Sequence, residues 1–395
     1  MVQQSPVDQK RRETSLIEAR PEARLSAMDD NLRQSEECVV RVACVRDHLQ
    51  PSGGTDELRR VFERLDRRRI HLELIVLGPR TAESAAFEAA GIKLLHLDHK
   101  HQIFATVRAA RADQLFLSGP KSQIWGSLAA RWIGLPASHY FNHMMSVRQI
   151  GFWTYVAQRA AIRRRDRAIA VSNVGRAWLA RQYGMPAAQI EVIHPTISLA
   201  HFENAGATRS VEGPEIVVVG RVVLAEKGQH LMIRAMPRIV SDYPSAVLTV
   251  IGDGRDLPAL RDLVTRAGLQ QSVRLLGQRR DVAALIRAAT LVVVPSMVPE
   301  GFPLVTLEAA AAGRPCVAFA SGGMVESVRD GETGILVPKG DVEALTKAIL
   351  SLLEEPELSR RMGEAGNRFA QRFRIERQVE EISAHFESLR GSTVA

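Results

Sequence analysis

A strand, a loop and a helix follow one another in residues 291–319 and decide the fold of this sequence. The stretch begins with the apolar run Leu291-Val-Val-Val294 and continues through Pro295-Ser-Met-Val-Pro-Glu-Gly-Phe-Pro303. Strong helix formers follow, and a second apolar run, Pro315-Cys-Val-Ala-Phe319, closes it. Two buried strands joined by a helix predict a parallel sheet covered by helices. We expect the helix to start at Pro303, because proline suits the first helical position.

The same alternation extends outward in both directions. Further predicted strands of the second half are Ile216–Val219, Ala246–Ile251, Val273–Leu276 and Gly334–Val337, and those of the first half are Val39–Val45, Leu72–Leu77, Ile92–Leu97 and Ala168–Val171. This order predicts an α/β protein with two tandem Rossmann-like domains. The predicted divisions are a disordered polar tail (1–36), an N-terminal domain (37–205), a linker (206–214), a C-terminal domain (215–370) and a final helix (371–395) that packs back on the N-terminal domain.

Composition agrees with a soluble two-domain protein. The chain has 395 residues, of which 46% are hydrophobic and 24% charged, close to average globular usage. Its scattered cysteines, Cys38, Cys44 and Cys316, form no Cys-x-x-Cys pair, which excludes a disulfide framework or zinc site and favours a reducing cytoplasm. The sequence contains neither a spanning run nor a signal-peptide pattern. The net charge of +8 favours anionic partners: phosphates, anionic lipid or nucleic acid.

Two cations follow the predicted strand 216–219 on a glycine-hinged loop. Arg221 and Lys227 lie between Gly220 and Gly228, at the carboxyl end of the strand, where open parallel sheets bind ligands. Fixed cations suit a diphosphate and can hold it without a metal ion. A solvated loop is the alternative interpretation.

Two glutamates flank the start of the predicted helix after Pro303. Glu300 precedes the helix and Glu308 lies about a turn and a half inside it. The N-terminus of a helix attracts phosphate, and carboxylates on either side can accept hydrogen bonds from sugar hydroxyls. For either glutamate alone a structural role is the better interpretation, as a helix cap for Glu300 or a solvated side chain for Glu308. The pair favours a site, because Ala309–Ala312 predicts a buried helix in which a stray carboxylate is costly. Gly252-Asp-Gly254 lacks the third glycine of a dinucleotide fingerprint, which disfavours a dehydrogenase.

In order and spacing, residues 215–345 resemble family-four retaining glycosyltransferases of the GT-B fold. The shared pattern is Gly-Arg…Lys-Gly, Gly-x-Gly, Pro-Ser…Glu-(seven)-Glu, Gly-Gly…Glu and a Gly-x-x-Gly-x-Leu-Val strand. The N-terminal half matches more loosely, through Gly53-Gly54 and Ala170-Val-Ser-Asn173. The resemblance implies two domains that face each other across a cleft.

The resemblance also implies roles for residues of the second half. A nucleotide diphosphate sugar is the donor; Arg221 and Lys227 neutralise its diphosphate, Glu308 binds the ribose and Glu300 binds the hydroxyls of the sugar. Backbone N–H groups that cradle the phosphate belong to Phe302, Leu304 and Val305.

In the first half, the resemblance implies that Gly53 and Gly54 let the backbone approach the diphosphate and the acceptor. The family's sugar-facing histidine falls at His143, with His139 as the alternative, and either is equally compatible with a structural role. His194-Pro-Thr196 replaces the family's Asn-Gly turn, and the spacing from Arg221 to Lys227 is one residue longer than usual.

No Asp-x-Asp occurs, so we expect a metal-independent, retaining hexosyl transfer from a UDP- or GDP-linked sugar to a glycan or lipid-linked acceptor. No cofactor is expected beyond that donor. The alternatives are a nucleotide-sugar epimerase or hydrolase on the same fold and a non-catalytic nucleotide-binding scaffold.

Eight arginines between Arg148 and Arg181 face one acid, Asp166. With interleaved apolar residues they predict a basic amphipathic helix that contacts anionic lipid at the inner face of the cytoplasmic membrane. A solvated arginine-rich surface is an equal alternative. Nucleic acid is not an expected partner, because no recognition motif accompanies the charge.

Overall fold

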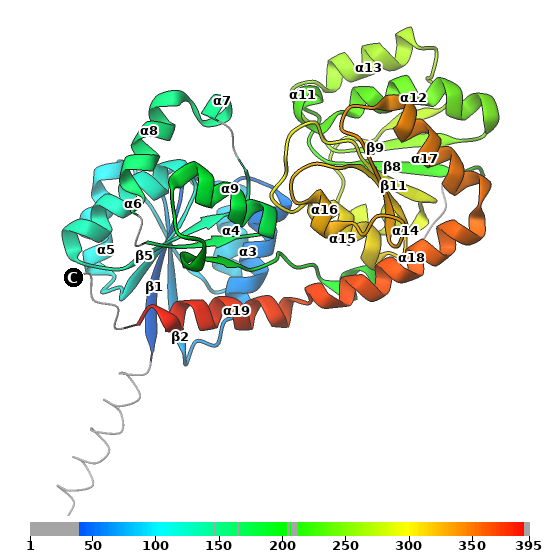
Figure 1. Cartoon of the computed structure of the whole chain (residues 1–395). Helices are drawn as coiled ribbons and strands as arrows, with labels where there is room; N and C mark the ends of the chain where they lie inside the picture. The colour runs from blue at the N-terminus through cyan, green and yellow to red at the C-terminus, as the bar shows by residue number, and fades with distance from the viewer. Residues whose placement is uncertain (1–38, 145–146, 164–165, 204–205, 207–211, 391–395) are drawn as a thin grey trace, which may run out of the picture.

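The computed structural model describes residues 39–390 except 145–146, 164–165, 204–205 and 207–211. Two α/β domains lie side by side (Figure 1), each built on a parallel sheet. The N-terminal sheet has the order β3-β2-β1-β4-β5-β6-β7 and the C-terminal sheet the order β10-β9-β8-β11-β12-β13. The predicted pair of Rossmann-like domains is confirmed. The predicted tail 1–36 lies outside the described residues, and so does most of the linker 206–214.

The N-terminal domain alternates strands and helices throughout. Its strands are β1 (Val40–Arg46), β2 (Ile70–Val76), β3 (Lys93–His96), β4 (Gln114–Ser118), β5 (Ala137–Phe141), β6 (Arg167–Ala170) and β7 (Ile190–Val192). Its helices are α3 (Gly53–Arg64), α4 (Ala82–Ala89), α5 (Ile103–Ala109), α6 (Pro120–Ile133), α7 (Val147–Ile150), α8 (Phe152–Ala161) and α9 (Asn173–Tyr183), and α10 (Leu199–Glu203) leads toward the second domain.

The C-terminal domain repeats the arrangement. Its strands are β8 (Glu215–Val219), β9 (Val247–Ile251), β10 (Val273–Leu275), β11 (Leu291–Val294), β12 (Cys316–Phe319) and β13 (Gly334–Val337). Its helices are α11 (Leu224–Lys227), α12 (Gln229–Asp242), α13 (Leu257–Arg266), α14 (Val282–Ala288), α15 (Leu304–Ala311), α16 (Met324–Ser327), α17 (Val342–Glu354) and α18 (Pro356–Ala370). Helix α15 begins at Leu304 with Pro303 as its N-cap, one residue later than predicted.

Strand β1 shows why both faces of the N-terminal sheet are covered. Val42 and Cys44 pack into the cluster that includes α3 and α19, whereas Ala43 and Val45 pack into the cluster of α5 and α6. Successive side chains of a strand point to opposite faces, so a strand that is apolar at every position requires helices on both sides.

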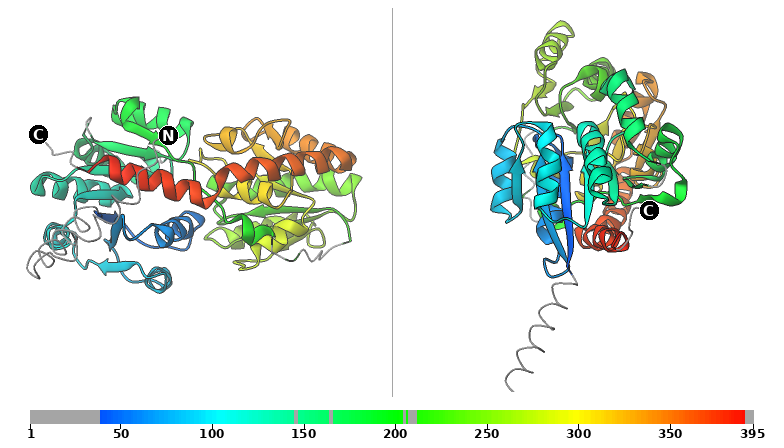
Figure 2. Two further views of the ribbon diagram at one scale, coloured as in Figure 1. Left: turned by 90° about the horizontal axis from the view of Figure 1, so that it is seen from below. Right: turned by 90° about the vertical axis from the view of Figure 1, so that its left-hand side faces the viewer.

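The last helix, α19 (Ile375–Ser388), crosses from the C-terminal domain to the N-terminal one (Figures 1 and 2). The amide of Gln114 in β4 donates to the carbonyl of Phe386 at 2.6 Å, and Gln378 donates to Glu57 of α3 at 2.5 Å. Arg69 forms a two-pronged ion pair with Glu387. The helix ties the domains together on one side of the molecule.

The basic amphipathic helix predicted from the arginines between Arg148 and Arg181 accounts for only part of that stretch, which also contains β6 where a strand was predicted over 168–171. The stretch forms α7, α8, β6 and α9, because the apolar run 168–170 pairs with β5 and β7 inside the sheet. Arg159, Arg167 and Arg176 therefore lie on separate elements, while Arg164 and Arg165 lie outside the described residues. Cys44 and Cys316 are buried and unpaired, while Cys38 lies outside the described residues. Within the described ranges, no helix is long and apolar enough to span a bilayer.

Candidate active site between the domains

The centre of the candidate site is an ion pair between Lys227 and Glu300. The Lys227 Nζ donates to the Glu300 Oε1 at 2.9 Å, and the Ser296 hydroxyl donates to the same oxygen. Lys227 ends α11, beyond β8, and Glu300 lies in the loop after β11. Because β8 and β11 are neighbours, their carboxyl ends bring both side chains into one pocket. This juxtaposition agrees with the expected ligand-binding edge of the sheet.

Glycine allows the two loops to approach. Gly228 has a φ of +67°, and a Cβ added there would lie 2.0 Å from the carbonyl oxygen of Pro295. The N–H of Met297 donates to the carbonyl of Glu226 at 2.7 Å. Any larger residue at position 228 would push the Lys227 loop away from Glu300.

Glu300 is held in its ionised form. Burial alone would raise its pKa, but Lys227, the hydroxyl of Ser296 and His143 together lower the pKa below its ordinary value. At neutral pH the site therefore contains an ammonium and a carboxylate side by side. The ammonium can hold a phosphate, and the carboxylate can accept hydrogen bonds from hydroxyl groups.

Arg221, the other predicted cation, stands apart from this pair. Its side chain is 68% exposed, and Nη2 lies 3.6 Å from Glu226. It lies on the same loop as Lys227 but does not line the pocket.

The start of α15 closes the pocket. Pro303, Leu304 and Val305 line it together with Lys227 and Glu300, and the first N–H groups of a helix have no partner within that helix. The side chain of Phe302 is instead buried and packs at the hinge between the domains, against His194 and Phe373. Only its backbone can serve the predicted phosphate cradle.

The N-terminal domain approaches the same point through Gly53 and Asn142. A Cβ at Gly53 would lie 3.0 Å from the Cδ1 atom of Leu304, and one at Gly54 would lie 3.2 Å from the side-chain amide nitrogen of Asn142. A Cβ at Gly301 would meet the carbonyl of Asn142 at 2.4 Å. Gly53 and Gly301 therefore permit the two domains to approach closely beside the ion pair, whereas Gly54 packs within its own domain. Asn142 is a contact that the sequence did not indicate.

Glu308 lies outside this pocket, a little more than one turn along α15. Its side chain is partly buried, and burial raises its pKa to about 7, partly offset by Arg60. Asp56, also in α3, raises the pKa further. The carboxyl group therefore faces the N-terminal domain.

The two candidate histidines have different surroundings. His139 is fully buried in β5, with its Nε2 atom 3.1 Å from the carboxylate of Asp166. His143 lies beyond the carboxyl end of β5 and is open to solvent. Desolvation by the surrounding protein is the largest effect on His143 and lowers its pKa. The negative charge of Glu300 raises the pKa, and the positive charges of Lys227 and Arg221 lower it. Of the two, His143 is the one near the charged pair.

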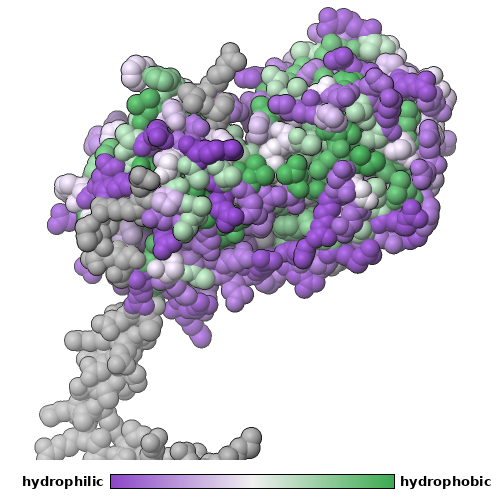
Figure 3. Space-filling view, in the orientation of Figure 1, coloured by the Kyte–Doolittle hydropathy of each residue, from purple (hydrophilic) through white to green (hydrophobic). Residues whose placement is uncertain are grey.

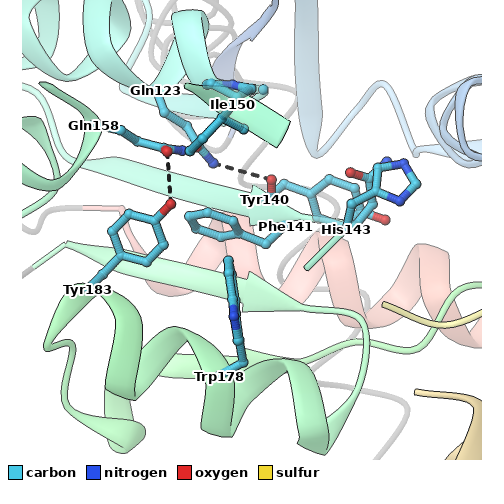
Figure 4. Close-up of a pocket in the computed structure, with 11 residues that line it drawn as sticks. Gln123, Tyr140, Phe141, His143, Ile150, Gln158, Trp178 and Tyr183 are labelled. Atoms are coloured by element: carbon cyan, nitrogen blue, oxygen red, sulfur yellow. Dashed lines mark hydrogen bonds between the residues drawn. The ribbon is translucent and has the colours of Figure 1, made fainter. Parts of the chain in front are cut away.

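A second pocket opens beside His143 (Figure 4). Its walls come from β5, α6, α7, α8 and α9 and are largely aromatic: Phe141 and Trp178 point into it, with Tyr183 beside them. The amides of Gln123 and Gln158 are already engaged, since Gln158 donates to Gln123 and accepts from the Tyr183 hydroxyl at 2.8 Å. The pocket therefore presents mainly apolar surface to a ligand.

Gly252 and Gly254 have a packing role. A Cβ at Gly252 would lie 2.0 Å from the carbonyl of Gly220, and one at Gly254 would lie 2.3 Å from that of Val222. The motif supports the loop that carries Arg221.

The described residues contain no group of three metal-ligating side chains.

Glu326, in the Gly-Gly…Glu motif, joins the domains. It accepts hydrogen bonds from the N–H groups of Asn173 (2.9 Å) and Val174 (2.7 Å) at the start of α9, and from the Asn173 side chain. Burial would raise its pKa, but the hydrogen bonds from His194, Asn173 and Val174 lower it to about 2. Its motif was visible in the sequence, but only the fold shows its partner.

Two parallel-sheet domains joined by a crossing helix, with paired charges at the strand ends between them, define a GT-B architecture. Comparison with family models agrees: residues 53–201 match the model described as Glycosyltransferase Family 4, and residues 202–369 match that of Glycosyl transferases group 1. The chain belongs to this glycosyltransferase family.

Curated relatives support the assignment. The chain is 30% identical over 298 residues to a GDP-mannose-dependent alpha-(1-6)-phosphatidylinositol monomannoside mannosyltransferase of Mycolicibacterium smegmatis, covering 70% of this chain and 74% of the relative. It is 37% identical to the glycogen synthase of Mycobacterium tuberculosis over 46% of this chain and 44% of that protein. The chain spans about half or less of the length of the first curated relatives it matches.

Solved structures share the fold. Anabaena HepE in complex with UDP has a TM-score of 0.79 at 20% identity, covering 88% of this chain and all of that one. The sucrose-phosphate synthase of Thermosynechococcus elongatus has a TM-score of 0.76 at 22% identity, covering 90% of this chain and all of that one.

Proposed function

We propose that this protein transfers a hexose from a UDP- or GDP-linked sugar to a glycan or lipid-linked acceptor, with retention of configuration and without a metal ion. The observation that carries the proposal is the Lys227–Glu300 pair beside the start of α15, opposite Gly53. Such a site offers fixed positive charge and N–H groups for a diphosphate and a carboxylate for sugar hydroxyls.

In the proposed reaction, Lys227 and the N–H groups of Leu304 and Val305 stabilise the charge that develops on the departing diphosphate. Glu300 orients the sugar by accepting hydrogen bonds from its hydroxyls. The acceptor oxygen bonds to the anomeric carbon on the face from which the diphosphate leaves, and a diphosphate oxygen takes the acceptor's proton. Positioning and charge stabilisation are the enzyme's contribution.

Glu308 and His143 have supporting roles in this proposal. Glu308 binds the ribose hydroxyls, and ligand binding then favours its ionised form. His143, whose pKa lies below its ordinary value, can donate a hydrogen bond to the sugar from the side of the N-terminal domain. Arg221 moves from its exposed position to the diphosphate.

The nature of the donor and acceptor is supported by the relatives. The mannosyltransferase relative is named for GDP-mannose and for a phosphatidylinositol monomannoside, and HepE was captured with UDP and with UDP-glucose. We therefore propose a UDP- or GDP-linked hexose and, for the acceptor, a glycan or a lipid-linked sugar, in a cytoplasmic setting at the membrane.

A transfer assay with UDP-glucose and GDP-mannose, in EDTA and then with Mg²⁺, tests the proposal. The expected result is turnover with one donor that EDTA does not reduce, with product whose anomeric proton coupling shows retention. Loss of the sugar to water alone in the presence of varied acceptors would favour a hydrolase. Absence of any turnover together with intact nucleotide binding would favour a scaffold.

A further inference from the structure

Exposed apolar side chains gather on one pair of helices. Six large apolar side chains are exposed in the described part of the chain, and only Val325 lies in the C-terminal domain. The other five belong to α6 and α8: Leu128, Trp132, Phe152, Trp153 and Val156. The two helices are neighbours, because Arg131 at the end of α6 donates to the carbonyl of Ala161 at the end of α8.

Helix α8 presents apolar residues to the solvent side. Trp153 is 80% exposed, Phe152 60% and Val156 40%, whereas Gln158 and Ala161 are buried toward the protein. A helix on a soluble surface normally has the opposite arrangement. A group of exposed aromatic side chains on one helix indicates an interaction site.

The charge around this surface is positive. No acidic residue occurs between positions 147 and 165. Arg131 and Arg159 donate to main-chain carbonyls, and within the described residues neither has a carboxylate partner. These hydrogen bonds hold the guanidinium groups near the C-terminal end of α8 without neutralising them. Anionic headgroups with an apolar layer beneath them complement this combination.

The surface is connected to the candidate site. Ile150, just before α8, and Gln158, on its buried side, line the largely apolar pocket beside His143. Hydrophobic atoms also stand out at the top of the N-terminal domain in Figure 3, where α8 begins. An acceptor held by a lipid at this surface would have a short apolar route toward His143.

We propose that the exposed face of α8, formed by Phe152, Trp153 and Val156, docks on an anionic lipid bilayer together with Arg131 and Arg159 near the end of the same helix, and that the acceptor is lipid-linked. The choice of acceptor rests on the proposed glycosyl transfer, whereas the docking does not. The aromatic side chains enter the interfacial layer, and the arginines contact lipid phosphates.

The test is co-sedimentation of the full-length protein with phosphatidylcholine vesicles, with or without phosphatidylglycerol. The wild type should bind the anionic vesicles and not the neutral ones. The double variant Phe152→Ser/Trp153→Ser should bind the anionic vesicles about tenfold more weakly, and Arg159→Gln should weaken binding less. Val325→Ser, which removes the exposed apolar side chain of the other domain, is the matched control and should bind like the wild type.

A thermal shift with UDP and GDP, run on the same samples, separates the two proposals. An unchanged nucleotide shift in the double variant shows that it is folded. Vesicle binding without any nucleotide shift would contradict the proposed function and leave the docking surface intact. Equal binding of the wild type and the double variant, or no vesicle binding at all, would overturn the docking proposal. So would a dimer that the double variant dissociates, because a second copy would then cover α8.

Discussion

The two domains contribute to the candidate site in different ways. On the C-terminal side the site is made of charged residues on short loops, with Lys227 and Glu300 held 2.9 Å apart at neighbouring strand ends. On the N-terminal side it is made of glycines, one histidine and a largely aromatic pocket. In the proposed reaction the charged side holds the diphosphate and the N-terminal side receives the acceptor, which accounts for the different residue types of the two sides.

The largest expected effect is that of Lys227→Ala, on the charged C-terminal side of the site. Removal of the ammonium leaves the developing charge of the diphosphate without its nearest cation, and we expect kcat/KM to fall by about 10²–10³-fold. The control is Lys347→Ala, which removes an exposed partner of Glu343 on α17; its activity should match the wild type. A drop of less than threefold in the Lys227 variant would contradict the assignment.

Variants of the two histidines distinguish a role in activity from a role in stability within the N-terminal domain. His143→Ala should lower kcat/KM by roughly 10- to 100-fold, because one oriented hydrogen bond to the sugar is lost. The melting temperature should stay unchanged. His139→Ala should instead lower the free energy of unfolding by about 1–3 kcal/mol, since it leaves Asp166 without its buried partner. Steady-state kinetics and thermal unfolding of both variants check this; the reverse outcome would exchange their roles.

Glu326→Gln tests the contact between the two domains, in which Glu326 accepts hydrogen bonds from the start of α9. The folded-state pKa of about 2 lies below the ordinary value of 4.5, so the carboxylate contributes stability above about pH 4.5 and loses it as pH falls toward 2. At pH 7 the variant should lose about 1–2 kcal/mol of unfolding free energy. Thermal unfolding between pH 3 and 7 should show the gap to the wild type narrowing as the pH falls; a gap that does not depend on pH would argue against an ionised contact.

The smallest expected effect is that of Glu308→Gln. Its folded-state pKa of about 7 lies above 4.5, so ionisation costs stability: the cost is absent below about pH 4.5 and complete above pH 7. The variant should therefore be more stable than the wild type at pH 8, by roughly 1 kcal/mol, and equal to it at pH 4. If Glu308 binds the ribose, the same variant should show a smaller melting-temperature shift with nucleotide, and an undiminished shift would refute that role.

The sequence predicted the candidate site best where the site is formed by residues that are close together along the chain. The strand 291–294 and the loop with Glu300 were predictable, because a buried apolar strand followed by proline, glycine and a helix is a local pattern. Strands β4 and β5 were not predicted, since Gln114, Ser118, Ser138 and His139 are polar residues buried within them. Their burial depends on partners from distant elements, such as Phe386 and Asp166.

The same reasoning explains the basic stretch. Its charge and a strand over 168–171 were predictable, but the division of the other residues among α7, α8 and α9 was not, because it depends on packing around the pairs that β6 forms with β5 and β7. Contacts between domains, such as those of Glu326 with α9 and of Asn142 with Gly301, join positions more than 150 residues apart. No local pattern specifies such pairs.

The most direct test of the central claim, that Lys227 and Glu300 hold a nucleotide diphosphate between the domains, is a calorimetric titration of UDP and GDP in EDTA. The wild type should bind one of them, and Lys227→Ala should bind it at least tenfold more weakly. Lys347→Ala should bind like the wild type. Equal affinity of the wild type and Lys227→Ala, or no binding of either nucleotide, would contradict the account.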